Sequence, residues 1–398
     1  MANTLLTLLR KPLTNSLLSK TNNISLTSLY IQDVKYLFSK ASLGLDGFSQ
    51  QSEKIKLQLN NIADKFREKM SEYVTIDSKN MIFTEDLKNM VHLTENDQDI
   101  QLTVEMLKKY NKQNKSLRFG NYVFGPVVMR MFYVHNKPDL ALECFKSEEL
   151  TGIFDQHISF QLLLDLLYEN QRYQEMLDVF QIISEKQLEG QKYPKNVIVL
   201  ILAACYKLNN QESLDWALKL WTQLSEVGHI PMRRASTFCA GLAFNQGKPD
   251  IALEILSSVR NQNYTTVRNL KVVALAEIGR LDDVIPILKF VLSDDTPQNE
   301  NVHTFNRDVL EKVKQAVSKS NNPEITLEFN RVEQMLIKQG HVSQTSLDEQ
   351  LCSEIQRPPI NRDFRAQQNF QPRGFNNEGF QQRPRRINYQ RPGLSELV

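Results

Sequence analysis

Two nearly identical phrases lie 111 residues apart in this chain, KPDLALECF at residues 137–145 and KPDIALEIL at residues 248–256. Related phrases begin at Thr103, Met176, Ala217 and Val284, so successive copies are separated by 32 to 41 residues. An internal period of this length is typical of stacked supersecondary units, each of which buries its apolar face only against its neighbours. The repeat therefore predicts a stack of similar units.

Each unit has the pattern of two antiparallel amphipathic helices. In the clearest unit, Leu163 and Leu167 stand at helical spacing before a polar turn, the spacing resumes around Phe180, and Pro194 ends the unit. We expect the first helices of the units near residues 83–93, 121–135, 158–170, 197–209, 234–246 and 267–279.

The predicted fold is all-α: a right-handed α-solenoid of about six helix-turn-helix repeats with disordered termini. The repeats are expected to fill residues 81–292, with an N-terminal capping helix in 48–80 and a C-terminal helical cap in 300–345. The longest apolar run, residues 197–205, is about half of the ~20 residues that span a bilayer, so no membrane insertion is expected.

Both ends of the chain are basic. Residues 1–32 contain Arg10, Lys11 and Lys20 but no acid, and their leucines gather on one helical face. This composition is typical of a mitochondrial transit peptide, the alternative being a disordered N-terminus.

The C-terminal residues 357–398 contain eight arginines and no lysine, with phenylalanines interspersed among glutamine, asparagine and proline. Such a composition predicts a disordered tail whose arginines pair with phosphates while its aromatic rings stack on bases. A neutral linker and a protein-docking tail are the alternatives. The candidate phosphate contacts in the tail are Arg373, Arg383, Arg385 and Arg386.

The sequence contains no pattern that favours catalysis. The six histidines form no HxxxH pair, and the four cysteines form no CxxC motif, which argues against the common zinc sites. The run GLAFNQGKP at residues 241–249 has the wrong spacing for a phosphate-binding loop and a proline where a magnesium ligand belongs. We therefore predict a protein that is not an enzyme and has no metal site and no small-molecule cofactor.

Several stretches resemble the pentatricopeptide repeat family. They are the unit ends EGQKYP at 189–194 and GHIP at 228–231, and the opening ISFQLLLDLL at 158–167. The first helices lack the Leu-Gly pattern of the tetratricopeptide repeat. The resemblance implies a solenoid of the mitochondrial matrix that takes part in RNA maturation and supports respiratory-chain function.

In that family, a polar side chain near the start of each first helix pairs with one RNA base. The resemblance places this role at Lys88, Gln161, Thr237 and Asn269. The corresponding residues of two further units, Pro126 and Val199, have no side chain that could hydrogen-bond a base.

Three arginines on or beside first helices are candidate phosphate contacts: Arg233, Arg234 and Arg268. The first two follow Pro231, near a helix start, where the helix dipole disfavours a cation unless an anion lies close. A solvated pair or a local salt bridge is the alternative.

Together these patterns predict a non-catalytic mitochondrial RNA-binding factor. It would hold single-stranded RNA along the groove of the first helices for processing by a separate nuclease. The alternative is a protein-binding helical scaffold in respiratory-complex or mitoribosome assembly.

Overall fold

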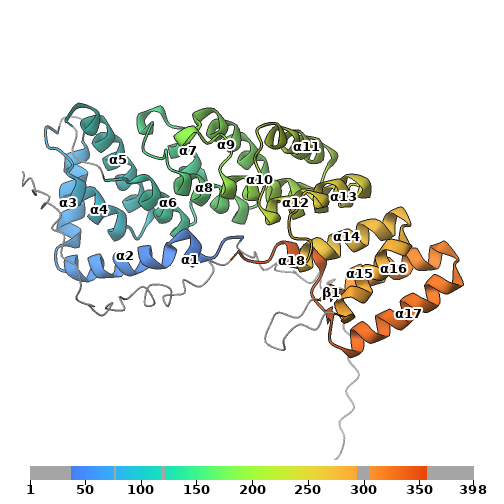
Figure 1. Cartoon of the computed structure of the whole chain (residues 1–398). Helices are drawn as coiled ribbons and strands as arrows, with labels where there is room; N and C mark the ends of the chain where they lie inside the picture. The colour runs from blue at the N-terminus through green and yellow to red at the C-terminus, as the bar shows by residue number, and fades with distance from the viewer. Residues whose placement is uncertain (1–36, 76–77, 118–121, 294–303, 356–398) are drawn as a thin grey trace, which may run out of the picture. The chain divides into compact units, whose positions relative to one another are not determined.

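The structure, a computed structural model, describes residues 37–75, 78–117, 122–293 and 304–355 (Figure 1). These residues form 18 α-helices and one two-stranded sheet, which confirms the predicted all-α helical-repeat solenoid. The predicted transit peptide (1–32) and arginine-rich tail (357–398) lie outside the described residues.

Seven helix pairs follow one another along the described chain, and we refer to the members of each pair as its first and second helix. The pairs are α4 (Thr84–Leu93) with α5 (Asp97–Leu117), α6 (Gly125–Val134) with α7 (Pro138–Lys146), α8 (His157–Glu169) with α9 (Tyr173–Lys186), α10 (Lys195–Leu208) with α11 (Gln211–Glu226), α12 (Arg233–Asn245) with α13 (Pro249–Ser257), α14 (Thr265–Ile278) with α15 (Leu281–Ser293), and α16 (Arg307–Ser320) with α17 (Pro323–Lys338). The first six first helices lie at the predicted places, and the structure adds a seventh pair where the sequence analysis expects a C-terminal cap.

Consecutive first helices pack against one another and form the centre of the stack. Helices α8 and α10 are buried over ten successive residues each, Ser159–Tyr168 and Val197–Tyr206. Most of these side chains are apolar, as expected of a helix that is surrounded by other helices. Small residues of the second helices are also buried, namely Ala141, Ala217 and Ala252.

Two helices occupy the region in which the sequence predicts one capping helix. Helix α2 (Leu45–Leu59) is separated from α3 (Ala63–Val74) by a turn that contains Asn60 and Asn61. Asparagine is a weak helix former, which explains the interruption. Helix α3 packs on α5 at the end of the stack, whereas α2 runs across the first helices α4 and α6 (Figure 1).

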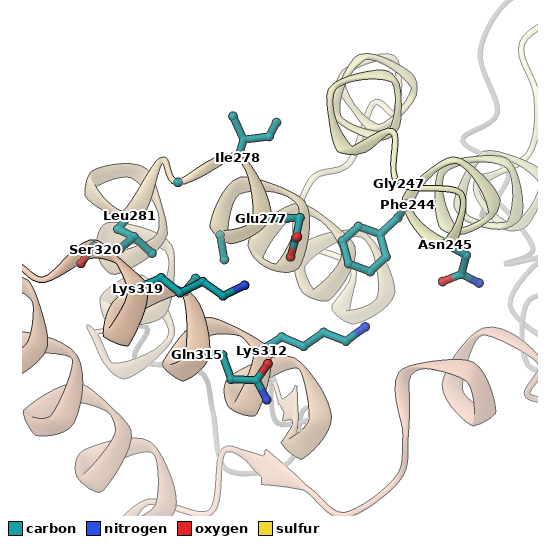
Figure 2. Close-up of a pocket in the computed structure, with 13 residues that line it drawn as sticks. Phe244, Asn245, Gly247, Glu277, Ile278, Leu281, Lys312, Gln315, Lys319 and Ser320 are labelled. Atoms are coloured by element: carbon teal, nitrogen blue, oxygen red, sulfur yellow. The ribbon is translucent and has the colours of Figure 1, made fainter.

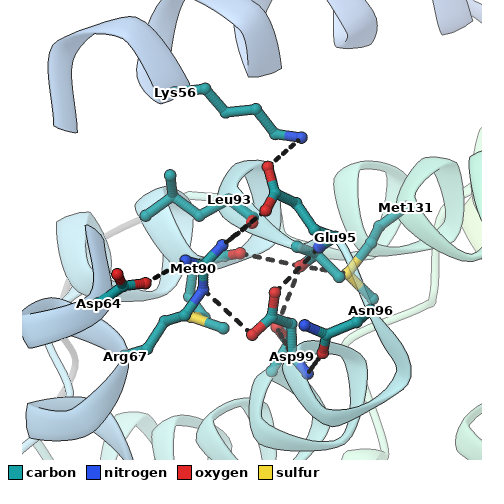
Figure 3. A network of polar contacts seen from close by, with 11 residues as sticks. Lys56, Asp64, Arg67, Met90, Leu93, Glu95, Asn96, Asp99 and Met131 are labelled. Atoms are coloured by element: carbon teal, nitrogen blue, oxygen red, sulfur yellow. Dashed lines mark hydrogen bonds and ion pairs between the residues drawn. The ribbon is translucent and has the colours of Figure 1, made fainter. Parts of the chain in front are cut away.

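An arginine-centred network ties α2 and α3 to the first repeat (Figure 3). The guanidinium group of Arg67 lies 3.3 Å from a carboxylate oxygen of Glu95 and 3.2 Å from one of Asp99, and it donates a 3.0 Å hydrogen bond to the carbonyl oxygen of Leu93. Lys56 of α2 pairs with the other oxygen of Glu95 at 3.0 Å. The network thus joins the four helices α2, α3, α4 and α5 around the turn that contains Glu95.

The two described ends of the chain meet on the side of the first helices. The backbone N–H of Ile355 donates to the carbonyl oxygen of Leu37 at 2.8 Å. The backbone N–H of Ser39 donates to the carbonyl oxygen of Ile355 at 3.2 Å. The short helix α1 (Lys40–Leu43) contacts α8, and α18 (Leu347–Leu351) contacts α12 and α14 (Figure 1). A second parallel pairing joins β1 (Phe305–Asn306) to β2 (Val342–Ser343). The sequence analysis predicts none of these contacts.

Gly125 at the start of α6 allows a close approach that no other residue permits. A Cβ atom at this position would lie 2.4 Å from the carbonyl oxygen of Ile153 and 2.1 Å from Oε1 of Gln156. We expect Gly125→Ala to lower the free energy of unfolding by about 1–3 kcal/mol, because a backbone carbonyl cannot move aside freely. Urea unfolding followed by circular dichroism measures the change.

The same substitution at Gly47 is the control. Its Cβ would meet nothing within 4 Å, and the residue is an exposed position of α2. Gly47→Ala should raise the free energy of unfolding by about 0.5–1 kcal/mol. Equal effects of the two substitutions would contradict the steric argument.

Candidate nucleic-acid interface

The three uncharged base-reading candidates are buried in the structure. Gln161 is 6% exposed, and Thr237 and Asn269 are 0% exposed. The Oε1 atom of Gln161 accepts a 2.9 Å hydrogen bond from Asn196 of the next first helix, and Thr237 donates to the carbonyl oxygen of Arg234 at 3.0 Å. These side chains would have to leave their present partners in order to read a base.

Asn269 links α14 to the segment that follows the sixth pair. Its side-chain amide donates to the carbonyl oxygens of Thr265 and Thr304, and its Oδ1 atom accepts from the backbone N–H of Asn306 at 3.0 Å. In the described structure, the side chain of Asn269 therefore fixes the position of α14 against the segment that leads into the next unit.

The fourth base-reading candidate, Lys88, lies at the surface of α4. Its Nζ atom donates to Glu85 at 2.7 Å and lies 4.2 Å from the ring centroid of Tyr122. The ammonium group is thus held between a carboxylate and an aromatic face.

The three arginine candidates have different environments. Arg268 is 4% exposed, and its guanidinium group lies 5.9 Å from the ring centroid of Phe290. Arg234 donates to Oγ of Ser353 at 2.8 Å. Arg233 is half-buried, with its guanidinium group 4.0 Å from the ring centroid of Tyr264. The four tail arginines lie outside the described residues.

Arg233 lines a pocket of about 380 Å³ between the end of α11 and the starts of α12 and α14. Trp221 and Tyr264 contribute aromatic faces to this pocket, and Arg260 contributes a second guanidinium group. Arginine and aromatic side chains together bind phosphates and stack on bases. We call Trp221, Arg233, Arg260 and Tyr264 the edge pocket.

The edge on which this pocket lies differs in charge from the opposite edge. In the five consecutive first helices α6, α8, α10, α12 and α14, the first turn has no acidic residue. Every second helix has at least one acid in its first turn. Because paired helices run antiparallel, those acids lie at the other edge. The starts of these first helices therefore leave their positive dipole ends available to a polyanion, although Glu148, Glu149 and Asp155 in the connection between α7 and α8 add acids to the same edge.

A larger pocket, of about 730 Å³, lies at the opposite ends of α12, α14 and α16 (Figure 2). Lys312 and Lys319 extend into it beside Glu277, and Nζ of Lys312 lies 4.7 Å from the ring centroid of Phe244. The C-terminal ends of three helices meet at this pocket, and their carbonyl groups carry partial negative charge. The two lysines offset this charge.

The buried carboxyl group of Asp165, the half-buried one of Glu169 and the hydroxyl group of Tyr133 form a further polar cluster beside residues 38–40. The hydroxyl group of Tyr133 donates to Asp165 at 2.7 Å and also contacts Glu169. Burial raises the pKa of Asp165 to about 8, and burial raises the pKa of Glu169 to about 7. The cluster lies beside a pocket of about 550 Å³ that Lys40 also lines. Sequence reasoning missed it, although Asp165 is the one acid in a run of ten buried residues.

Neither metal nor membrane features are found in the described part of the chain. Within it, no group of three or more His, Cys, Asp or Glu side chains could hold a metal ion. None of the described helices combines the length and the apolar character required to cross a bilayer. All four cysteines are buried and unpaired, and burial raises the pKa of the thiol groups of Cys144 and Cys239 to about 12.

These features define an all-α helical-repeat protein with one pocket lined by arginine and aromatic residues. Over 318 residues, 80% of this chain, it is 29% identical to the mouse (Mus musculus) protein named "Pentatricopeptide repeat-containing protein 2, mitochondrial", of which 82% is covered. The human (Homo sapiens) protein of that name is 28% identical, with 80% of each chain covered. The frog (Xenopus laevis) protein is 26% identical, with 81% of this chain and 82% of the relative covered.

No protein-family model matches the chain. The resemblance to pentatricopeptide repeat proteins that the sequence analysis describes is nevertheless confirmed by these relatives. The relatives are all named as mitochondrial, which supports the same compartment for this chain.

The buried carboxyl group of Asp165 predicts that stability falls as the pH rises from about 4 to about 8. The folded chain holds a proton on Asp165 up to about pH 8, whereas the unfolded chain loses it near pH 4, so the folded state loses stability throughout this range and levels off above it. Between pH 6.5 and 8.5 the loss is about 2 kcal/mol. His92, whose pKa burial lowers to about 4, acts in the opposite sense but only below about pH 6.5.

Urea unfolding at a series of pH values tests this expectation. Asp165→Asn should remove most of the fall between pH 6.5 and 8.5. The control is Asp178→Asn, which changes an exposed acid of α9 and should leave the fall intact. A wild-type profile that is flat over this range would refute the assignment.

Proposed function

We propose that this chain is a non-catalytic mitochondrial RNA-binding factor that takes part in RNA maturation. The repeat architecture and the similarity to pentatricopeptide repeat proteins support this proposal, because repeats of that kind bind single-stranded RNA. The observation that carries it is the edge pocket, where two arginines and two aromatic rings stand on an edge free of acids in the first turns of five helices.

In this proposal the RNA backbone follows the starts of the first helices. Arg233 and Arg260 bind phosphates, and Trp221 and Tyr264 stack on bases. Lys88 adds a contact at the first repeat, and the tail arginines Arg373, Arg383, Arg385 and Arg386 add contacts that do not depend on sequence.

In the cell, residues 1–32 would direct the chain to the mitochondrial matrix in this proposal. There it presents a transcript to a separate nuclease and so supports respiratory-chain function. Gln161, Thr237 and Asn269 would contribute base contacts only in a state in which they have exchanged their present hydrogen bonds for bonds to bases.

Replacing Arg233 and Arg260 together with alanine should weaken binding of single-stranded RNA about tenfold at low salt. It should also reduce the slope of log affinity against log salt concentration by about 1.4, because each phosphate contact on a single strand contributes about 0.7. Fluorescence anisotropy with a labelled oligoribonucleotide measures both quantities.

The matched control is the double variant Lys219→Ala with Arg331→Ala. It removes two exposed basic side chains from the second helices α11 and α17. We call the double variant Arg233→Ala with Arg260→Ala the edge variant. If the control variant loses as much affinity for RNA as the edge variant, binding depends on overall charge and the edge pocket has no special role.

A protein-binding scaffold is the second candidate function. It is favoured by the segments around α1 and α18, which cover part of the first-helix side. Exposed apolar residues such as Leu327 and Ile337 on α17 offer contact area for a protein. Protein partners that crosslink to the chain equally well before and after ribonuclease treatment, together with no measurable RNA affinity, would favour the scaffold.

A further inference from the structure

The C-terminal segment of the described chain lies across three first helices. We call residues 347–355, which comprise α18 and the residues up to the Leu37–Ile355 hydrogen bond, the C-terminal lid. The lid contacts α12 and α14 and ends beside the N-terminal segment (Figure 1).

Four side chains under or beside the lid come from consecutive first helices. Tyr168 lies on α8, Tyr206 and Lys207 on α10, and Arg234 on α12. Burial and the neighbouring Cys352 raise the pKa of Tyr168, and burial and the neighbouring Asp348 raise that of Tyr206. The lid thus covers two aromatic rings and two cations.

Oxygen atoms of the lid accept hydrogen bonds from the two cations, Lys207 and Arg234. Nζ of Lys207 lies 3.3 Å from both carboxylate oxygens of Asp348. Arg234 donates to Oγ of Ser353 and to the carbonyl oxygens of Gln350 and Leu351 at the end of α18. Phosphate oxygens bind lysine and arginine through the same charge-assisted hydrogen bonds.

The chemistry of this covered surface is that of a single-stranded nucleic-acid site. Aromatic rings on neighbouring repeats provide stacking platforms, and cations beside them neutralise phosphates. Gly241 lets the lid approach this surface closely, because a Cβ atom there would lie 3.0 Å from the ring of Tyr206 and 3.3 Å from Leu351.

The lid is held by few apolar side chains. Leu347, Leu351 and Cys352 are buried, and α18 has only five residues. The side chain of Asp348 remains 55% exposed, so its ion pair with Lys207 is open to solvent. The low apolar content and the solvated ion pair lower the free-energy cost of opening, whereas the hydrogen bonds of Arg234 and of Ile355 raise it, so opening depends on a ligand that replaces those bonds.

We propose that the C-terminal lid occupies a second single-stranded RNA site, formed by Tyr168, Tyr206, Lys207 and Arg234, and that RNA binding at this site displaces the lid. The inference rests on the proposed function and adds a regulatory element to it. RNA held at the edge pocket is unaffected by the lid, whereas RNA that extends onto α8, α10 and α12 competes with it.

Cys352 reports on the lid in the unmodified full chain. Brief labelling with iodoacetamide followed by mass spectrometry gives the reactivity of each cysteine. Adding a saturating single-stranded oligoribonucleotide should make Cys352 react about tenfold faster, because the open state becomes the populated one. Cys205 and Cys239, buried in α10 and α12, should not change.

A lid variant tests the competition directly. Asp348→Asn with Leu351→Ala removes the ion pair and the central apolar contact without touching the covered surface. It should bind the same oligoribonucleotide about tenfold more tightly and should label faster at Cys352 without RNA. Adding Lys207→Ala and Arg234→Ala to this variant should cancel the gain in affinity.

The matched control is Glu354→Gln with Leu336→Ala, which makes the same two chemical changes at an exposed lid acid and at a buried leucine of α17. It should leave RNA affinity unchanged, and a gain equal to that of the lid variant would overturn the proposal. Unchanged affinity of the lid variant and unchanged Cys352 labelling, while the edge variant still loses RNA, would also overturn it and leave the proposed function standing. No RNA binding by the full chain or by any variant would overturn both.

Discussion

The stack depends on the burial of its central first helices from all directions. Helix α10 contacts α8 and α12 on its two flanks and packs against the second helices α9 and α11. Ten successive side chains are therefore removed from water, and any polar group among them must find a partner inside the protein. This constraint explains why Gln161 and Asn269 bond to the neighbouring unit. A polar residue at the start of a first helix can hydrogen-bond either a ligand or the neighbouring unit. In this structure Gln161 and Asn269 bond to the neighbouring unit.

The sequence predicts the helix pairs well because the signal for them is local. Apolar spacing, polar turns and the repeated phrase lie within about forty residues, so each unit can be recognised without knowledge of the others. The start of α18 also has a readable signal, since Ser346 and Glu349 form a capping box. What the sequence analysis could not supply is the exposure of individual side chains. Gln161 and Arg234 are both candidate RNA contacts in the sequence, one for a base and one for a phosphate. Their environments are set by residues that lie 35 and 119 positions away.

Arg233 was found from the sequence because its position at a helix start is unfavourable for a cation, and this reasoning needs one helix only. Its partners in the edge pocket were missed, because Trp221, Arg260 and Tyr264 belong to other helices or to the connections between them. The separation of charge between the two edges also follows from the sequence once the helix boundaries are known. Acids at the starts of second helices offset the positive ends of those helices, whereas the first helices lack this compensation. A chain with a formal net charge of only +2 can thereby present one edge suited to an anion.

The backbone hydrogen bonds of Ile355 with Leu37 and Ser39 have a consequence for the order in which the fold can be completed. Most contacts of the stack join neighbouring units and can form as soon as those units exist, which is typical of repeat proteins. Residues 37–39 are different, because their bonding partner, Ile355, lies more than 300 residues further along the chain. A chain that is synthesised from its N-terminus must hold residues 37–39 without this partner until Ile355 arrives. Closure of this pair therefore requires that the chain has been delivered at least as far as Ile355.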